Sequence, residues 1–398
     1  MSGPRPSSGR PGARLLDAVR ARLVRDAAEP TLAAVAAAVR AEGATLGDAE
    51  VLALSRTLRA DLAGAGPLEP LLADPGITDI LVNGPREIWV DDGSGLRRVD
   101  DVGFADEDAV RRLAQRLAAQ AGRRLDTAVP WVDAQLASGA RLHAVLPPVS
   151  PEGTRLSLRL PRHRAFTLAE LVGSGALPPA GALLLRSLVE SRCPFLISGG
   201  TGTGKTTLLS TLLSLASPTE RLVLVEDSAE LRPEHPHVVR LQSRPPNIEG
   251  RGGVELDQLV RQALRMRPDR LVVGEVRGPE VVSLLQALNT GQEGGAGTLH
   301  ANTAADVPTR VEALGCAAGL SREAVHSQLA ATRAIVVHLV RRPGGPRRVA
   351  QLCVLRRAPD GTVTAVPAVT FPSGGDLRRD AAFAELHDRL GLGAGRRR

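Results

Sequence analysis

Ten residues near the middle of the chain, from Ser198 to Thr207, combine glycines, a lysine and hydroxyl groups at a spacing suited to phosphate binding. They read Ser-Gly-Gly-Thr-Gly-Thr-Gly-Lys-Thr-Thr and contain the pattern G-x-x-x-x-G-K-[ST]. Glycines let backbone N–H groups surround a phosphate chain without Cβ clashes. The spacing therefore predicts a phosphate loop that binds nucleotide through Gly199, Gly200, Thr201, Gly202, Thr203, Gly204, Lys205, Thr206 and Thr207.

The lysine of this loop stands out against the rest of the chain. Among 50 basic residues, Lys205 is the sole lysine and all others are arginine. A compact ammonium fits between phosphate oxygens where a planar guanidinium does not. We expect Lys205 to reach the β- and γ-phosphates of ATP and Thr206 to hold Mg²⁺. The alternative interpretation is a glycine-rich turn between a strand and a helix.

Further polar side chains follow predicted strands on the C-terminal side of the loop. The loop itself follows a short apolar segment, 194–198, and precedes a helical segment whose N-terminus would face the phosphates. Three later strands end at Glu226, Glu275 and His300. Ligands of open α/β sheets bind at the carboxyl ends of strands, so we expect these side chains to meet at the loop.

Two carboxylates and an imidazole beside a phosphate loop suit phosphoryl transfer to water. One carboxylate would position the attacking water and the other would help to hold Mg²⁺. We assign Glu226 to the water and Glu275, with Thr206, to the metal side, while His300 would sense the γ-phosphate. Only one of Glu226 and Asp227 can point inward, because side chains alternate along a strand. Exposed strand ends and a structural histidine are the alternatives.

The pattern of apolar residues predicts an α/β protein with a RecA-like P-loop NTPase domain and a mainly parallel sheet. An α+β N-terminal domain and a small helical module precede it. Strands are expected near 194–198, 221–226, 237–241, 270–274 and 296–300, alternating with helices, and a strand pair is expected at 334–341 and 347–356. The expected divisions are a disordered tail 1–13, a helical module 14–63, an α+β domain 64–161, a hinge 162–167, the ATPase domain 168–371 and a flexible basic tail 372–398.

The composition narrows the classes of partner. The formal net charge of +7 permits peripheral contact with anionic lipid, whereas only 2% of residues are aromatic, which disfavours stacking on nucleic-acid bases. No apolar run approaches the ~18 residues that span a bilayer. The first residues are not a secretory signal, and the three cysteines have neither metal nor disulfide spacing. We therefore expect a reduced, cytoplasmic protein.

Several motifs in fixed order resemble one family. They are Gly199 to Thr207, Val-Glu-Asp-Ser-Ala-Glu-Leu at 225–231, Arg-Pro-Pro-Asn-Ile-Glu-Gly at 244–250, Val-Gly-Glu-Val-Arg-Gly at 273–278, and Gly-Thr-Leu-His-Ala-Asn at 297–302. Earlier matches include Gly-Pro-Leu-Glu-Pro at 66–70 and Thr-Asp-Ile-Leu-Val-Asn-Gly at 78–84. Together these resemble the CpaF/TadA family of pilus-assembly and secretion ATPases, in the type II/type IV secretion superfamily.

The resemblance implies a cytoplasmic homo-hexameric ring that hydrolyses ATP against inner-membrane platform proteins, to build Flp-type pili or to drive secretion. By the same resemblance, the loop is Walker A and Glu226 to Glu230 is an acidic box. Gly274-Glu275 is an atypical Walker B that lacks the usual aspartate, and Thr298 to His300 belong to a histidine box. Related sequences often carry histidine where this chain has Gln292, which leaves His300 as the one imidazole of that box.

Two further expectations concern the completion of the site and the alternatives in function. Arginine often stabilises the charge of the phosphoryl-transfer transition state. Of Arg141 and Arg159 in the N-terminal domain, we favour Arg159, acting on a neighbouring subunit; the alternative is a surface arginine.

The second candidate function is a nucleic-acid-translocating ATPase of a conjugation-like system. A third, a scaffold that binds ATP without hydrolysis, is disfavoured by the intact acidic positions.

Overall fold

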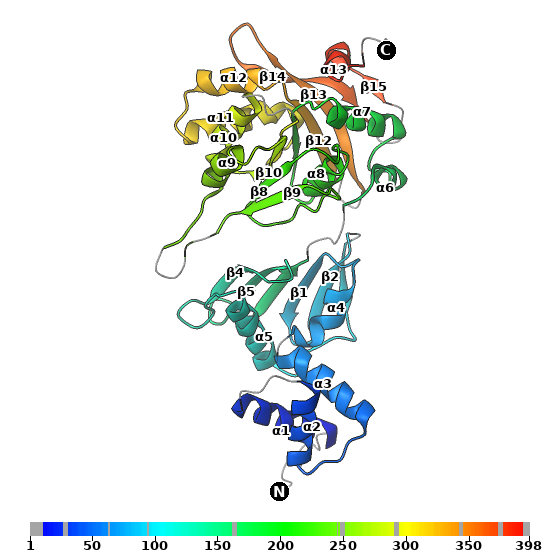
Figure 1. Cartoon of the computed structure of the whole chain (residues 1–398), viewed down its shortest axis with the longest axis vertical. Helices are drawn as coiled ribbons and strands as arrows, with labels where there is room; N and C mark the ends of the chain where they lie inside the picture. The colour runs from blue at the N-terminus through cyan, green and yellow to red at the C-terminus, as the bar shows by residue number, and fades with distance from the viewer. Residues whose placement is uncertain are drawn as a thin grey trace. The chain divides into compact units, whose positions relative to one another are not determined.

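The computed structural model divides the chain into two compact units, Met1–Pro161 and Arg162–Arg398 (Figure 1). The structure describes residues 11–26, 31–62, 64–93, 95–160, 165–244, 246, 251–289, 294–341, 345–372 and 377–392. Residues 1–10 of the expected disordered tail 1–13 and residues 162–164 of the expected hinge 162–167 lie outside the described residues. The described ends of both segments belong to regular structure, because a helix begins at Pro11 and Thr167 caps another.

The first unit begins with three helices that enclose a small apolar core. They are α1 (Pro11–Arg25), α2 (Leu32–Ala41) and α3 (Asp48–Leu62). The side chain of Thr31 accepts a hydrogen bond from the Ala34 amide, which starts α2. Buried residues from all three helices form the core: Val19, Leu23, Val35, Ala38, Val39 and Leu58. A 3-10 turn, η1 (Gly66–Leu68), and a short helix, α4 (Glu69–Ala73), follow.

An antiparallel sheet forms the rest of the first unit. Its strand order is β3-β2-β1-β6-β5-β4, and every neighbouring pair is antiparallel. The strands are β1 (Asp79–Gly84), β2 (Glu87–Asp91), β3 (Leu96–Val99), β4 (Trp131–Gln135), β5 (Arg141–Val145) and β6 (Arg155–Arg159). The buried face of α5 (Glu107–Gln120) joins the same apolar core as the sheet. The predicted α+β architecture is confirmed, although the sequence did not predict β3 and β4.

The second unit is built on a large mixed sheet. Within the described residues its order is β15-β14-β13-β12-β7-β11-β10-β8-β9. The six strands from β12 to β9 in this order are parallel: β12 (Ile335–Arg341), β7 (Phe195–Gly199), β11 (Ala296–His300), β10 (Arg270–Val276), β8 (Leu222–Glu226) and β9 (Val238–Gln242). This arrangement confirms the predicted RecA-like fold class, with strand ends within two residues of those expected.

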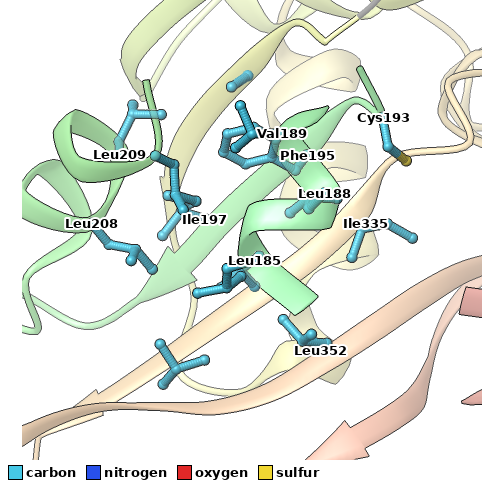
Figure 2. Packing of buried hydrophobic residues seen from close by; sticks show 14 of the residues in the cluster. Leu185, Leu188, Val189, Cys193, Phe195, Ile197, Leu208, Leu209, Ile335 and Leu352 are labelled. Atoms are coloured by element: carbon cyan, nitrogen blue, oxygen red, sulfur yellow. The ribbon is translucent and has the colours of Figure 1, made fainter. Parts of the chain in front are cut away.

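Helices cover both faces of this sheet (Figure 1). One apolar core packs against α6 (Leu168–Gly173), α7 (Pro179–Glu190) and α8 (Lys205–Leu213). The other packs against α9 (Leu256–Leu264), α10 (Glu280–Asn289), α11 (Val307–Ala317) and α12 (Arg322–Ala331), with η2 (Ala304–Asp306) before α11. Strand residues alternate between the two cores, so Phe195 and Ile197 pack with residues of α7 and α8 (Figure 2). Leu196 belongs to the core on the opposite side. The strand that leads into the phosphate loop is thus fixed from both faces.

The C-terminal end of the chain contains structure that its composition did not indicate. β13 (Arg347–Arg357) and β14 (Val363–Thr370) extend the sheet antiparallel, and β15 (Arg378–Arg379) and α13 (Phe383–Arg389) follow. The sequence predicted a flexible basic tail over 372–398, whereas the described residues 377–392 contain a short strand and a helix. Leu386 and Leu390, one helical turn apart, are buried in the core with α7 and α8. A few well-spaced leucines were enough to pack this segment despite its many glycines and arginines.

Candidate nucleotide-binding site

The predicted phosphate loop lies between the fully buried strand β7 and helix α8. Gly199, Gly202 and Gly204 all have positive φ, at 154°, 70° and 94°, which non-glycine residues rarely adopt. A Cβ on Gly199 would lie only 2.6 Å from the Leu339 carbonyl oxygen of the neighbouring strand β12. Glycine is therefore required both by backbone conformation and by the close approach of β12. The geometry matches that expected from the sequence motif.

Lys205 opens α8, and its ammonium lies over the loop. Nζ donates to the carbonyl oxygens of Gly199 and Gly200, each at 3.1 Å, and the residue is buried. Burial lowers the pKa of Lys205, while the negative charges of Glu275 and Glu230 oppose that shift. The lysine is thus held at the N-terminus of a helix, where the helix dipole also favours an anion.

Glu275, near the carboxyl end of β10, is the carboxylate whose charge acts most strongly on Lys205. Its side chain is partly exposed and forms an ion pair with Arg277. The structure therefore brings Glu275 to the lysine of the loop, as the strand-end argument predicts. The assignment of Thr206 and Glu275 to Mg²⁺, both oxygen donors of the kind that this ion prefers, stays a prediction.

Glu226, at the end of β8, is buried and held by the backbone that follows it. Its Oε1 accepts hydrogen bonds from the amides of Glu230 and Leu231, both at 2.9 Å. Burial raises the pKa of Glu226 despite these two bonds. Asp227, in contrast, is exposed and accepts from the Ser243 hydroxyl. Of the two adjacent acidic residues, the structure therefore turns Glu226 inward.

The packing of Glu226 also accounts for the glycine at position 274, where the resemblance implies an atypical Walker B motif without its usual aspartate. A Cβ on Gly274 would lie 2.8 Å from Cγ of Glu226, so any side chain at position 274 would displace the glutamate. The Gly274 carbonyl in turn accepts a hydrogen bond from the Thr298 hydroxyl at 2.7 Å. The glycine therefore makes room for the carboxylate of the neighbouring strand.

His300 ends β11 directly beside the phosphate loop. In the parallel pairing of β11 with β7, His300 is the register partner of Gly199. The residue is partly buried. The structure places it where the sequence predicted, next to the first glycine of the loop. Gln292, the departure from the family pattern, lies outside the described residues.

A second histidine, His338, lies beneath the loop and was not expected to contribute. Its Nδ1 is 2.9 Å from the Ser198 hydroxyl, and it also hydrogen-bonds to the Asn302 backbone. The ring is buried, and burial lowers its pKa. His338 thus joins the end of β7 to the segment after His300. The sequence held no sign of this, because the parallel pairing of β12 with β7 depends on the tertiary fold.

The arginine proposed to act on a neighbouring subunit has a partner within its own unit. Nε of Arg159 lies 3.1 Å from Oδ1 of Asp79 on β1, and the guanidinium is exposed. Arg141, its register partner on β5, makes two hydrogen bonds to Asp133. Exposed ion pairs of this kind are weak and readily exchanged. The action of Arg159 at a phosphate loop remains a prediction.

Comparison with known proteins identifies the family. The family model described as type II/IV secretion system protein matches residues 61–356. The chain belongs to this family. A putative conjugal transfer protein of Mycobacterium tuberculosis is 57% identical over 351 residues, covering 87% of this chain and 98% of that protein. The type IV secretion system protein PtlH of Bordetella pertussis is 35% identical, covering 60% of this chain and 76% of PtlH.

Solved structures agree with the fold of this type II/IV secretion system protein. The pilus retraction motor PilT, determined with bound ADP, superposes with a TM-score of 0.50 at 21% identity, covering 72% of this chain and 80% of PilT. Family membership confirms the predicted type II/type IV secretion superfamily, and the likeness to PilT agrees with the predicted fold. In the described part of the chain, every helix is too short or too polar to span a bilayer.

Proposed function

We propose that this type II/IV secretion system protein is an ATP-hydrolysing motor that powers Flp/Tad-type pilus assembly or secretion. In this proposal it works as a cytoplasmic homo-hexameric ring on platform proteins at the inner face of the cell membrane. The observation that carries the proposal is the glycine-rich loop with Lys205 at the start of α8 and the charge of Glu275 acting on that lysine, in a chain of the secretion family.

The geometry supports a division of labour among these residues. Lys205 and the glycine-rich loop would bind the phosphates, and Thr206 with Glu275 would hold Mg²⁺. When bound, Mg²⁺ supplies charge neutralisation at the phosphates. Glu226 would orient the attacking water and accept its proton, for which a raised pKa is suited. The amides of Glu230 and Leu231 fix this carboxylate by holding its Oε1.

Nucleic-acid translocation is the second candidate, because the relative from M. tuberculosis carries the printed name putative conjugal transfer protein. The two functions are separated by steady-state ATP turnover measured alone, with single- and double-stranded DNA, and with vesicles of anionic lipid. We expect no stimulation by either DNA, since few aromatic residues are available for stacking on bases. A several-fold stimulation by DNA would favour the translocating ATPase instead.

Replacement of His300 by alanine should slow hydrolysis without abolishing nucleotide binding. His300 is the register partner of Gly199, and in this proposal its ring senses the γ-phosphate while the loop is held by other contacts. We expect kcat to fall by about tenfold, less than the roughly 100-fold or more expected for loss of a general acid or base, with little change in the Kd for ATP. Steady-state rates and binding measured from pH 6 to 9 check this, and wild-type rates throughout would leave His300 a structural residue.

Ring formation predicts that activity depends on protein concentration, because active sites would be shared between subunits. We expect the specific activity of the wild type to rise steeply as the ring assembles. Arg159→Ala should still bind ATP but hydrolyse it slowly, since removal of a transition-state arginine lowers kcat rather than affinity. ATP turnover and light scattering, measured together over a dilution series of the wild type, test whether activity rises as the ring assembles.

Mixing two inactive variants tests whether Arg159 acts between subunits. Arg159→Ala supplies an intact loop, and Lys205→Ala supplies an intact arginine. If the arginine acts on the neighbouring subunit, the mixture should recover part of the wild-type rate. Arg141→Ala is the matched control, because Arg141 pairs with Asp133 on the same sheet. No recovery, with subunit exchange shown by labelled chains, would exclude the proposed action between subunits.

A further inference from the structure

Two arginines from the C-terminal strands lie next to the phosphate loop, on the side where β12 pairs with β7. β12 runs parallel to β7 with Leu339 beside Gly199, so it continues for two residues past the first loop glycine and ends at Arg341. β13 returns antiparallel and pairs Arg347 directly with Arg341. The sequence suggested only a terminal strand pair here, and the pairing with β7 brings both arginines to the loop.

Arg347 contacts the loop directly, and the Arg341 side chain lies close to it. Nε of Arg347 donates to the Gly202 carbonyl oxygen at 2.8 Å, and its Cδ lies 3.5 Å from the position of a Cβ on Gly204. Nη1 of Arg341 lies 3.5 Å from the position of a Cβ on Gly202. In the part of the chain that the structure describes, the Arg341 guanidinium makes neither a hydrogen bond nor an ion pair. A charged group therefore lies at the loop with its donors available.

The strand order shows which part of a nucleotide would meet these arginines. Glu226, Glu275 and His300 come from β8, β10 and β11, which all lie on one side of β7, whereas β12 lies on the other side. The γ-phosphate must face the carboxylates that act on it. In the nucleotide orientation on which the inference is built, the α-phosphate and the nucleoside extend in the opposite direction, over the β12 side of the loop.

We infer that Arg341 and Arg347 bind the α-phosphate and ribose end of the nucleotide, with Arg347 also positioning the loop through Gly202. A guanidinium offers several donors in a fixed plane that matches phosphate oxygens. This inference rests on the proposed function, because it takes the loop to bind ATP. It assigns the arginines to affinity and not to the transition state, in contrast to the expected role of Arg159.

The two roles differ in measurable constants. ATP and ADP share the α-phosphate and the nucleoside, so loss of either arginine should weaken both nucleotides by the same factor. Arg341→Ala and Arg347→Ala in the full-length chain should each raise the Kd for ADP and for ATP about tenfold, as measured by calorimetry. KM should rise in parallel while kcat stays within about twofold of the wild type, the signature of uniform binding.

A matched control and a conservative variant complete the test. Arg357→Ala removes an exposed arginine from the far end of β13 and should leave both Kd values unchanged. Arg347→Ala should also lower the unfolding temperature, because the Gly202 carbonyl loses its donor. Arg347→Lys retains a donor for Gly202 but loses the planar fork, so it should recover the wild-type unfolding temperature without recovering ADP affinity. Recovery of both by lysine would overturn the contact assigned to Arg347.

Failure of this inference can be distinguished from failure of the proposed function. If the wild type is active and both alanine variants bind ADP within twofold of the wild-type affinity, this inference is overturned while the proposed function stands. A loss of kcat at unchanged ADP affinity would also overturn it, since it would place the arginines at the transferred phosphate. A wild-type chain that neither binds nor hydrolyses ATP would instead overturn the proposed function.

Discussion

Replacement of Lys205 by alanine should abolish ATP turnover and most nucleotide affinity. The ammonium lies over the loop, held by the carbonyl oxygens of Gly199 and Gly200, at the start of α8. No other cation in the chain has its size and flexibility, because every other basic side chain is an arginine. We expect kcat to fall by at least about 100-fold, as for loss of a preorganised charge at a reacting phosphate. Phosphate release and nucleotide calorimetry measure both effects.

The conservative replacement Lys205→Arg should be almost as damaging. The ammonium is buried between two loop carbonyls, and a planar guanidinium in that space would displace the loop or the phosphates. Arg357→Ala again serves as a control for loss of one positive charge. Activity of Lys205→Ala or Lys205→Arg within a few-fold of the wild type would be incompatible with the assigned site.

The parts of the site that could be predicted from sequence are those that depend on local pattern. The glycines of the loop are constrained by their own φ angles, and the spacing of Lys205 and Thr206 follows from one strand–loop–helix unit. Glu275 and His300 could also be placed, because parallel strands align their carboxyl ends at one edge of the sheet. Periodicity of apolar residues was therefore enough to bring these residues together.

The parts that could not be predicted depend on which strands become neighbours. His338 and Arg341 reach the loop only because β12 pairs with β7, and nothing in residues 334–341 indicates that partner. The role of Gly274 likewise became clear only from its contact with Glu226 on the adjacent strand. α13 was missed for a related reason, since Leu386 and Leu390 are apolar residues in a sequence that otherwise resembles a linker.

Glu226→Gln and Glu275→Gln should each bind ATP and fail to hydrolyse it, with different consequences for the loop. Glutamine at position 226 keeps an oxygen acceptor for the amides of Glu230 and Leu231, so the fold should be retained while the base is lost. Glutamine at position 275 removes the charge beside Lys205 and should weaken the Mg²⁺ dependence of binding as well. We expect kcat to fall by about 100-fold or more in both variants, because each charge acts mainly in the transition state.

The pH dependence of kcat separates Glu226 from the other titrating groups. Glu226 can accept a proton only when it is ionised, and burial raises its pKa, so kcat should fall with decreasing pH at values above the ordinary range of a glutamate. This acidic limb should persist in His300→Ala, since it does not arise from the imidazole. It should disappear from the residual activity of Glu226→Gln, which has no carboxyl group to protonate. If the limb is lost in His300→Ala but unchanged in Glu226→Gln, the proton acceptor is the histidine, and the assignment of Glu226 as the base is wrong.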